Sequence, residues 1–188
     1  MAETPGAERS FGLDDADLAV HPTIYAPDAF AGQSVLVTGG AGGIGRAVAW
    51  LLGRLGARVV IAGRDPEKLE AAAAAMRARG LAVRAHAVDI REPEAVHALF
   101  DAIAAEEGHI DMLVNSAGGQ FPKEAIDIPA KGWNAVVNTN LNGTWHAMQA
   151  AARALRDADR PGSIVNIVVV TTHGLYGVAH TVAARSGV

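Results

Sequence analysis

The chain has 188 residues, of which 50% are hydrophobic and 19% are charged, and its formal net charge is −4. These values predict one globular domain with a hydrophobic core, and they do not indicate nucleic acid or an anionic membrane surface as a partner. The absence of cysteine excludes disulfides, thiolate catalysis and thiolate metal sites. No apolar run has the length of a membrane span and the first residues lack the pattern of a signal peptide, so we expect a cytoplasmic protein.

Residues 1–31 contain several glycines and prolines and show little periodicity. Such a segment is typical of an extension, so we place the start of the domain at residue 32. The extension is expected to pack on the domain through four apolar side chains, namely Phe11, Ile24, Tyr25 and Phe30.

The glycine-rich run at residues 38–45, with the sequence TGGAGGIG, is the most informative segment of the chain. It follows an apolar stretch at residues 34–37 and opens a helical pattern of apolar residues: Ile44, Ala47, Val48, Leu51, Leu52 and Leu55. A glycine turn between a buried strand and a helix lets the backbone approach a pyrophosphate, whose charge is stabilised by free N–H groups and the helix dipole. An ordinary tight turn also needs glycine, but the flanking strand and helix favour nucleotide binding.

The rest of the chain alternates strand and helix patterns. Further strands are predicted over residues 58–62, 83–88, 112–114 and 163–169, and helices over residues 66–80, 93–108 and 133–155. Continuous β-branched strands separated by amphipathic helices predict an α/β fold with a doubly wound parallel sheet. A dinucleotide fold of this kind has two mononucleotide halves, and only the start of one more helix follows the fifth strand, so we expect the second half to be incomplete.

Five segments of this pattern occur together and in order: residues 38–45, 89–90, 110–118, 138–143 and 162–167. Together they resemble the short-chain dehydrogenase/reductase family. The resemblance implies an oxidoreductase whose NAD(P)-binding Rossmann-type domain, residues 32–188, is truncated at its C-terminal end. It also implies a homodimer or homotetramer in the full-length form.

One branch of the family is most similar. Residues 118–121, 131–133, 163–167 and 180–188 resemble the trans-2-enoyl-CoA and 2,4-dienoyl-CoA reductases. Bacterial members of this similarity group are also described as terpenoid-alcohol (citronellol-type) dehydrogenases. The resemblance therefore leaves the substrate open.

The end of the second predicted strand bears on the choice between NAD and NADP. An acidic side chain there would accept hydrogen bonds from the ribose of NAD, whereas this chain has Gly63 followed by Arg64. A guanidinium can pair with the 2′-phosphate of NADP, so NADP(H) is favoured over NAD(H), although a surface arginine beside a turn is the alternative. The resemblance assigns further cofactor contacts, with Asp89 serving equally well as a helix cap: Gly39, Gly43, Ile44, Gly45, Asp89, Ile90, Asn115, Ala117 and Gly118.

The usual catalytic site of the family combines a tyrosine, a lysine, a serine and an asparagine, and the resemblance places only the asparagine here, as Asn140. Val168 and Val169 follow Ile167 where the serine is expected. Alignment on the final residues puts Thr181 at the tyrosine and Arg185 at the lysine. Because a guanidinium has no proton to give and a threonine is a poor general acid, the ordinary alcohol-dehydrogenase mechanism is not expected.

Enoyl-CoA reductases of the family show a comparable departure, because hydride then goes to a carbon–carbon double bond. Their main electrostatic task is to stabilise an enolate-like oxygen, for which Asn140, Thr181 and Arg185 are candidate catalytic residues. His180 and Tyr176 are nearby candidates for the proton donor. The histidines lack the spacing of metal ligands, so no metal site is expected.

The sequence therefore predicts an NADP(H)-dependent oxidoreductase that acts on a small-molecule substrate of the enoyl-CoA type. A carbonyl or terpenoid-alcohol (citronellol-type) dehydrogenase is the first alternative. A non-catalytic NADP-binding protein, or an inactive truncated fragment, is the second.

Overall fold

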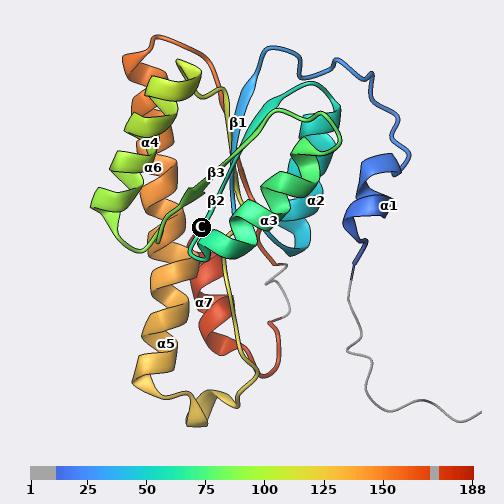
Figure 1. Cartoon of the computed structure of the whole chain (residues 1–188). Coiled ribbons are helices and arrows are strands. Elements are labelled where there is room, and N and C mark those ends of the chain that lie inside the picture. Colours follow the sequence, from blue (N-terminus) through green and yellow to red (C-terminus); the bar gives the residue numbers. More distant parts are fainter. Residues whose placement is uncertain (1–11, 170–173) are drawn as a thin grey trace, which may run out of the picture.

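The structure is a computed structural model that describes residues 12–169 and 174–188. Within them a five-stranded sheet has the strand order β3-β2-β1-β4-β5. All four strand pairings are parallel, which confirms the Rossmann-type doubly wound α/β fold. The strands are β1 (Ser34–Thr38), β2 (Arg58–Gly63), β3 (Val83–Ala87), β4 (Met112–Asn115) and β5 (Ser163–Asn166) (Figure 1).

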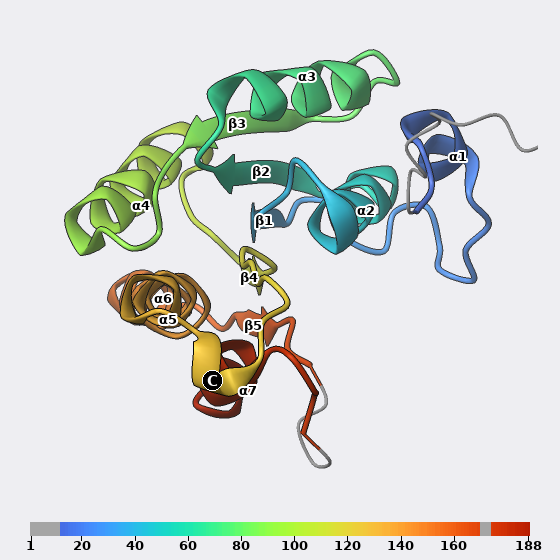
Figure 2. The same cartoon turned by 90° about the horizontal axis from the view of Figure 1, so that it is seen from below.

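Helices cover both faces of the sheet. Figure 2 shows α2 (Gly43–Arg54) and α3 (Pro66–Arg77) on one face, and α4 (Pro93–Glu107) and α6 (Thr144–Asp157) on the other. Two shorter helices, α5 (Ala130–Val137) and α7 (Ala179–Ser186), lie beyond the carboxyl ends of the central strands. This arrangement leaves the carboxyl edge of β1 and β4 facing the segments that carry the predicted site residues.

Two differences between the predicted and the observed elements bear on the site. The fifth strand ends at Asn166 instead of residue 169, and the predicted helix over residues 133–155 is three consecutive pieces, α5, a π-helical segment (Asn138–Gly143) and α6. The π-helix widens the turn around Asn140, a distortion that apolar periodicity does not reveal. The break therefore falls at a predicted catalytic residue.

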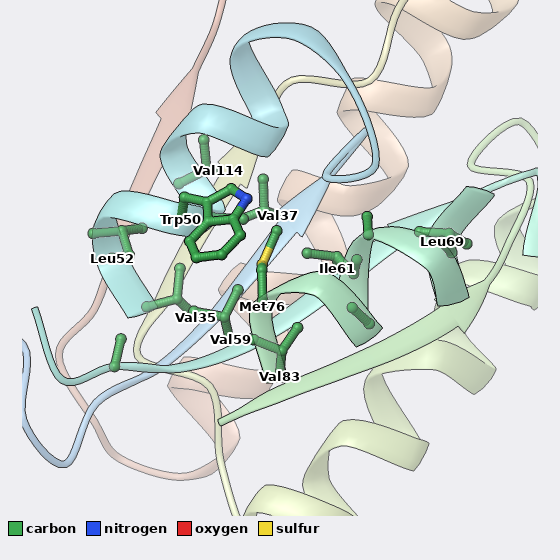
Figure 3. Packing of buried hydrophobic residues seen from close by; sticks show 14 of the residues in the cluster. Val35, Val37, Trp50, Leu52, Val59, Ile61, Leu69, Met76, Val83 and Val114 are labelled. Atoms are coloured by element: carbon green, nitrogen blue, oxygen red, sulfur yellow. The ribbon is translucent and has the colours of Figure 1, made fainter. Parts of the chain in front are cut away.

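The sheet separates two hydrophobic clusters, because successive strand residues point to opposite faces. On the face of α2 and α3, Trp50 and Met76 are buried against alternate residues of the central strands, including Val35, Val37 and Ile61 (Figure 3). On the opposite face, Leu36, Val60 and Leu113 pack with residues of α4 and α6. Strands buried on both faces explain the continuous apolar runs in the sequence.

The N-terminal extension contains a short helix that the sequence analysis did not predict, α1 (Asp15–Val20). The carboxylate of Asp14 accepts a hydrogen bond from the amide of Asp17 and caps it. Leu18 is buried in the cluster under α2 and α3, and the indole of Trp50 donates to Asp15 Oδ1 at 2.7 Å. The extension is thus held by a helix face.

The apolar residues expected to anchor the extension behave differently from one another. Phe30 packs on the core, whereas Ile24 is 96% exposed and Tyr25 is also exposed, so the expectation was wrong for these two. Phe11 lies outside the described residues. Leu18 of α1, which the sequence analysis did not single out, is buried in the core instead.

Asp111, just before β4, connects β1 with the loops before β4 and β5. Its carboxylate accepts hydrogen bonds from the amide of Ser34 at 2.9 Å and from Arg160 at 2.9 Å, and its side chain is 14% exposed. His109 lies 3.1 Å from the same carboxylate. Burial alone would raise the pKa of Asp111, but the Ser34 amide, Arg160 and His109 outweigh it and hold that pKa below its ordinary value.

The lowered pKa makes part of the stability depend on pH. The unfolded chain binds a proton at about pH 3.9, above the folded pKa, so the contribution of Asp111 is complete above that pH and is lost as the pH falls further. We expect Asp111→Asn to lower the free energy of unfolding at pH 7 by about 1–3 kcal/mol and to reduce its fall between neutral and acid pH. Urea unfolding at about pH 7 and at about pH 2.5, which lies below the pKa of the unfolded chain, measures both. The exposed Asp101→Asn is the control, and equal pH dependence in the two variants would contradict the assignment.

Among the described residues, no helix combines the length and the apolar character that crossing a bilayer requires. Nor do three or more histidine, aspartate or glutamate side chains come together as a metal-ligand group in residues 12–169 and 174–188.

Candidate cofactor and active site

The glycine turn between β1 and α2 lies tightly against the segment after β4. Gly39 has a φ of +71°, which favours glycine, and a Cβ there would lie 2.9 Å from Cα and N of Ala117. A Cβ on Gly45 would overlap the carbonyl oxygen of Gly39. The absence of a side chain at Gly39 and Gly45 therefore allows the turn to pack tightly against itself and against the segment after β4.

The other side of the turn is open. A side chain at Gly42 or Gly43 would meet no atom within 4 Å. Gly42 caps α2 without a side-chain hydrogen bond, and the first turn of the helix has no acidic residue. The N-terminus of this 12-residue helix therefore offers backbone N–H groups and a positive dipole end to an anion. A dinucleotide pyrophosphate fits this cradle.

The turn forms one wall of a cleft of about 510 Å³. The opposite walls are the segment after β4 (residues 116–120), the backbone after β5 (residues 167–169) and two polar side chains, Asn140 and Arg185. Seven predicted site residues meet in this cleft: Gly39, Gly43, Ile44, Ala117, Gly118, Asn140 and Arg185. Gln120 also lines it, and the sequence analysis did not single that residue out.

Asn140 is buried in the π-helical segment and is held by three hydrogen bonds. Its Oδ1 accepts from the amide of Gly119 at 2.9 Å, and its Nδ2 donates to the carbonyl of Gly119 at 2.9 Å and to Thr181 Oγ1 at 3.1 Å. The side-chain amide thus ties the segment after β4 to α7. π-Helical insertions often occur at functional sites, and this one orients a side chain that lines the cleft.

Thr181 lies behind Asn140. It is 1% exposed, and it is not among the described residues that line the cleft. Because its hydroxyl accepts a hydrogen bond from Asn140, the geometry gives it a positioning role in place of the expected contact with substrate.

The two candidate proton donors also lie away from the cleft lining. Tyr176 is 89% exposed and its hydroxyl donates to Glu124 Oε1 at 3.0 Å. His180 is fully buried, with its ring edge-on to Phe121 and its Nδ1 accepting from the amide of Thr181. Neither imidazole nor phenol of these residues lines the cleft as described.

Arg185 reaches the cleft from α7. Its Nη1 donates to the carbonyl of Ile167 at 3.0 Å, just past the end of β5. Burial lowers the pKa of the guanidinium from its ordinary value, but arginine remains charged at neutral pH. The residue is the only charged side chain among the described residues that line this cleft.

A second, smaller pocket of about 180 Å³ adjoins the cleft through Gly118 and Gly119. Arg64, at the end of β2, and Arg91 both line it. Arg91 forms an ion pair with Asp89, and its hydrogen bonds hold the pKa of Asp89 below the usual range. Arg91 was missed by sequence reasoning, although it directly follows the Asp89–Ile90 pair.

Ile90 and Asn115 are buried behind the residues that line the cleft. Ile90 is buried, and a Cβ on Gly143 would lie 2.6 Å from its Cγ1. Asn115 is buried between neighbouring strands, where its Oδ1 accepts from Thr38 at 3.4 Å and its Nδ2 donates to Asn166 at 3.0 Å. Neither side chain lines the cleft, so their contribution to it is the placement of the surrounding backbone.

Comparisons with known proteins agree with this geometry. The family model for short chain dehydrogenases matches residues 33–187. A protein from Bacillus subtilis (strain 168) named "Probable 2,4-dienoyl-CoA reductase" is 34% identical over 157 residues, which are 83% of this chain and 62% of that protein. A solved structure, citronellol catabolism dehydrogenase from Pseudomonas aeruginosa PAO1, superposes with a TM-score of 0.83 at 43% sequence identity. The match covers 88% of this chain and 67% of that protein's chain.

The matching structures include one complex with NADP and one with NAD+. The chain spans 62% of the length of the curated relative from Bacillus. With the family model matched over nearly all of the domain, the chain belongs to the short-chain dehydrogenase/reductase family of oxidoreductases.

Proposed function

We propose that this protein is an NADP(H)-dependent oxidoreductase that transfers hydride to or from an enoyl-CoA-type substrate. The observation that carries the proposal is the cationic side chain that faces the cleft. Arg185 supplies hydrogen-bond donors there. Asn140 is already engaged with Gly119 and Thr181. Three apolar residues, Ile167, Val168 and Val169, line the cleft just after β5. Such a site stabilises negative charge on a carbonyl oxygen without offering a proton.

The cofactor supplies a hydride when it is bound. The residues of this chain that would hold it are the backbone of the glycine turn, at the pyrophosphate, and the segment that follows β4. Asn140 keeps the latter segment in place through both polar atoms of its amide.

The citronellol catabolism dehydrogenase supports a second candidate function, oxidation of an alcohol or reduction of a carbonyl, because it is 43% identical. That chemistry needs a group that exchanges a proton with the substrate oxygen. The charged group that lines the cleft is the guanidinium of Arg185, which donates hydrogen bonds and remains protonated at neutral pH. This donor favours the enoyl-type reaction.

A thermal melt with NADPH and with NADH, followed by an assay of NADPH oxidation with crotonyl-CoA and with citronellal, tests the proposal. We expect NADPH to raise the melting temperature and crotonyl-CoA to be reduced. Reduction of the aldehyde alone would favour the alcohol-dehydrogenase function. Binding of NADPH without turnover of either substrate would leave a non-catalytic NADP-binding protein.

Preference for NADP(H) is proposed from the two arginines beside the small pocket. Arg64 and Arg91 both line it, so two guanidinium groups are available to a 2′-phosphate. Arg91 is already paired with Asp89, whereas Arg64 is exposed at the end of β2. This difference favours Arg64 as the group that gains most from the phosphate.

Replacing Arg64 by alanine is expected to weaken NADPH binding by about 10- to 100-fold, the value of one or two charge-assisted hydrogen bonds. NADH binding is expected to change little, because NADH lacks the 2′-phosphate. Titration of both cofactors by fluorescence gives the two dissociation constants. Arg79→Ala, at an exposed arginine in the turn after α3, is the matched control, and equal losses for both cofactors would contradict the role of Arg64.

Two wider expectations stay predictions. These are the cytoplasmic location expected in the sequence analysis and the homo-oligomer that the family resemblance implies, and sedimentation analysis of the purified chain tests the second.

A further inference from the structure

The guanidinium of Arg185 occupies the space that a side chain at position 118 would fill. A Cβ on Gly118 would overlap Nη2 of Arg185 and would lie 2.9 Å from Oδ1 of Asn140. No such restriction exists at the next residue, because a Cβ on Gly119 would meet no atom within 4 Å. Because Gly118 has no side chain, the guanidinium of Arg185 can lie directly against its backbone.

The guanidinium is held at that place from the other side as well. Nη1 donates to the carbonyl of Ile167 at 3.0 Å, and the side chain is half-buried. A guanidinium has five N–H donors, so one bond to Ile167 leaves others for a ligand in the cleft. A cation fixed between two backbone segments is preorganised, which is what electrostatic stabilisation requires.

We propose that Gly118 provides a seat for Arg185, and that the seated guanidinium receives the negative charge that develops on the substrate carbonyl oxygen. The proposal rests on the proposed function, since it names the group that acts in the enoyl reduction. Arg185 is then the catalytic residue and Gly118 is a positioning residue.

The reaction balances with this assignment. Hydride from the reduced cofactor forms a C–H bond at the β-carbon, and the π electrons of the double bond move to make the enolate of the thioester, with its charge on oxygen beside Arg185. The enolate α-carbon then takes a proton from water, and the products are the saturated thioester, the oxidised cofactor and hydroxide. No protein proton donor is needed, which agrees with the positions of Tyr176 and His180 away from the cleft.

The test uses acetoacetyl-CoA, a thioester that ionises to an enolate with its own near-ultraviolet absorption band, added to the purified chain with saturating NADP+. This probe reports enolate stabilisation without any hydride transfer. In the unsubstituted protein we expect the band to grow on binding. In Arg185→Gln and in Gly118→Ala we expect the enolate fraction to fall by about tenfold, the value of one charge-assisted contact.

Three comparisons sharpen the result. Arg185→Lys keeps the charge and is expected to restore part of the band, and Gly119→Ala is expected to reduce it much less than Gly118→Ala. Arg153→Gln, an exposed arginine on α6, is expected to leave it unchanged. If Gly118→Ala does not fold, as judged by its circular dichroism, the two Arg185 variants carry the test.

An absent band in the unsubstituted protein, or an equal band in Arg185→Gln, would overturn the proposal. If the band is lost in Arg185→Gln but kept in a folded Gly118→Ala, the positioning role of Gly118 is wrong. A band without NADPH oxidation by crotonyl-CoA would reject only the proposed reaction, and oxidation without the band would reject only the role of Arg185.

Discussion

Trp50→Ala is expected to lower the free energy of unfolding by about 3–5 kcal/mol, the cost of removing a large aromatic side chain from a close-packed core. Trp50 is 1% exposed and lies in the cluster between the sheet and helices α2 and α3. Its indole also holds α1 through Asp15. The substitution therefore leaves a cavity and releases the N-terminal helix together. Urea unfolding, followed by circular dichroism, measures the loss.

Two milder substitutions separate the contributions. Trp50→Phe keeps most of the buried area but removes the N–H donor, and Asp15→Ala leaves the indole N–H without its acceptor. Each is expected to cost about 0.5–1.5 kcal/mol, the net value of one hydrogen bond that is partly buried. A loss below about 1 kcal/mol in Trp50→Ala would show that this side chain is not part of the packed core.

Gly45→Ala is expected to abolish measurable cofactor binding, with a loss of at least about 100-fold, and to destabilise the fold by about 1–3 kcal/mol. The new Cβ would overlap the carbonyl oxygen of Gly39, so the turn must open or α2 must shift. Either movement displaces the backbone N–H groups that face the cleft. Fluorescence titration with NADPH and a thermal melt give the two quantities.

Gly42→Ala is the matched control for stability. Its backbone is extended, with φ of −156°, and a Cβ would meet no atom within 4 Å. We therefore expect an unchanged melting temperature without cofactor, while NADPH binding weakens because the methyl group enters the cleft. A Gly45→Ala protein that melts and binds like the unsubstituted chain would contradict the tight closure of the turn.

Local patterns were sufficient for most of the architecture. The strands β1, β2 and β4 are continuous apolar runs, and the caps and stops of α3 and α4 are side-chain and backbone preferences that act within a few residues. The local sequence pattern was insufficient where a contact between residues distant in the sequence determines the structure. The π-helical segment Asn138–Gly143 is one such place, since its Asn140 forms hydrogen bonds with Gly119 and Thr181, which lie far away in the sequence.

The sequence by itself determined the fold class and the glycine turn, because both depend on periodicity or on residues close together in the chain. Its motifs, spread over residues 38–167, carried the resemblance to the family. Only the tertiary structure decided what the candidate catalytic residues face. Thr181, Asn140 and Gly119 are far apart in sequence, and the packing of α7 against the π-helical segment puts the threonine behind the asparagine. The same packing lays Arg185 over Gly118, since a side chain takes its direction from the helix that carries it and its position from the helix's neighbours.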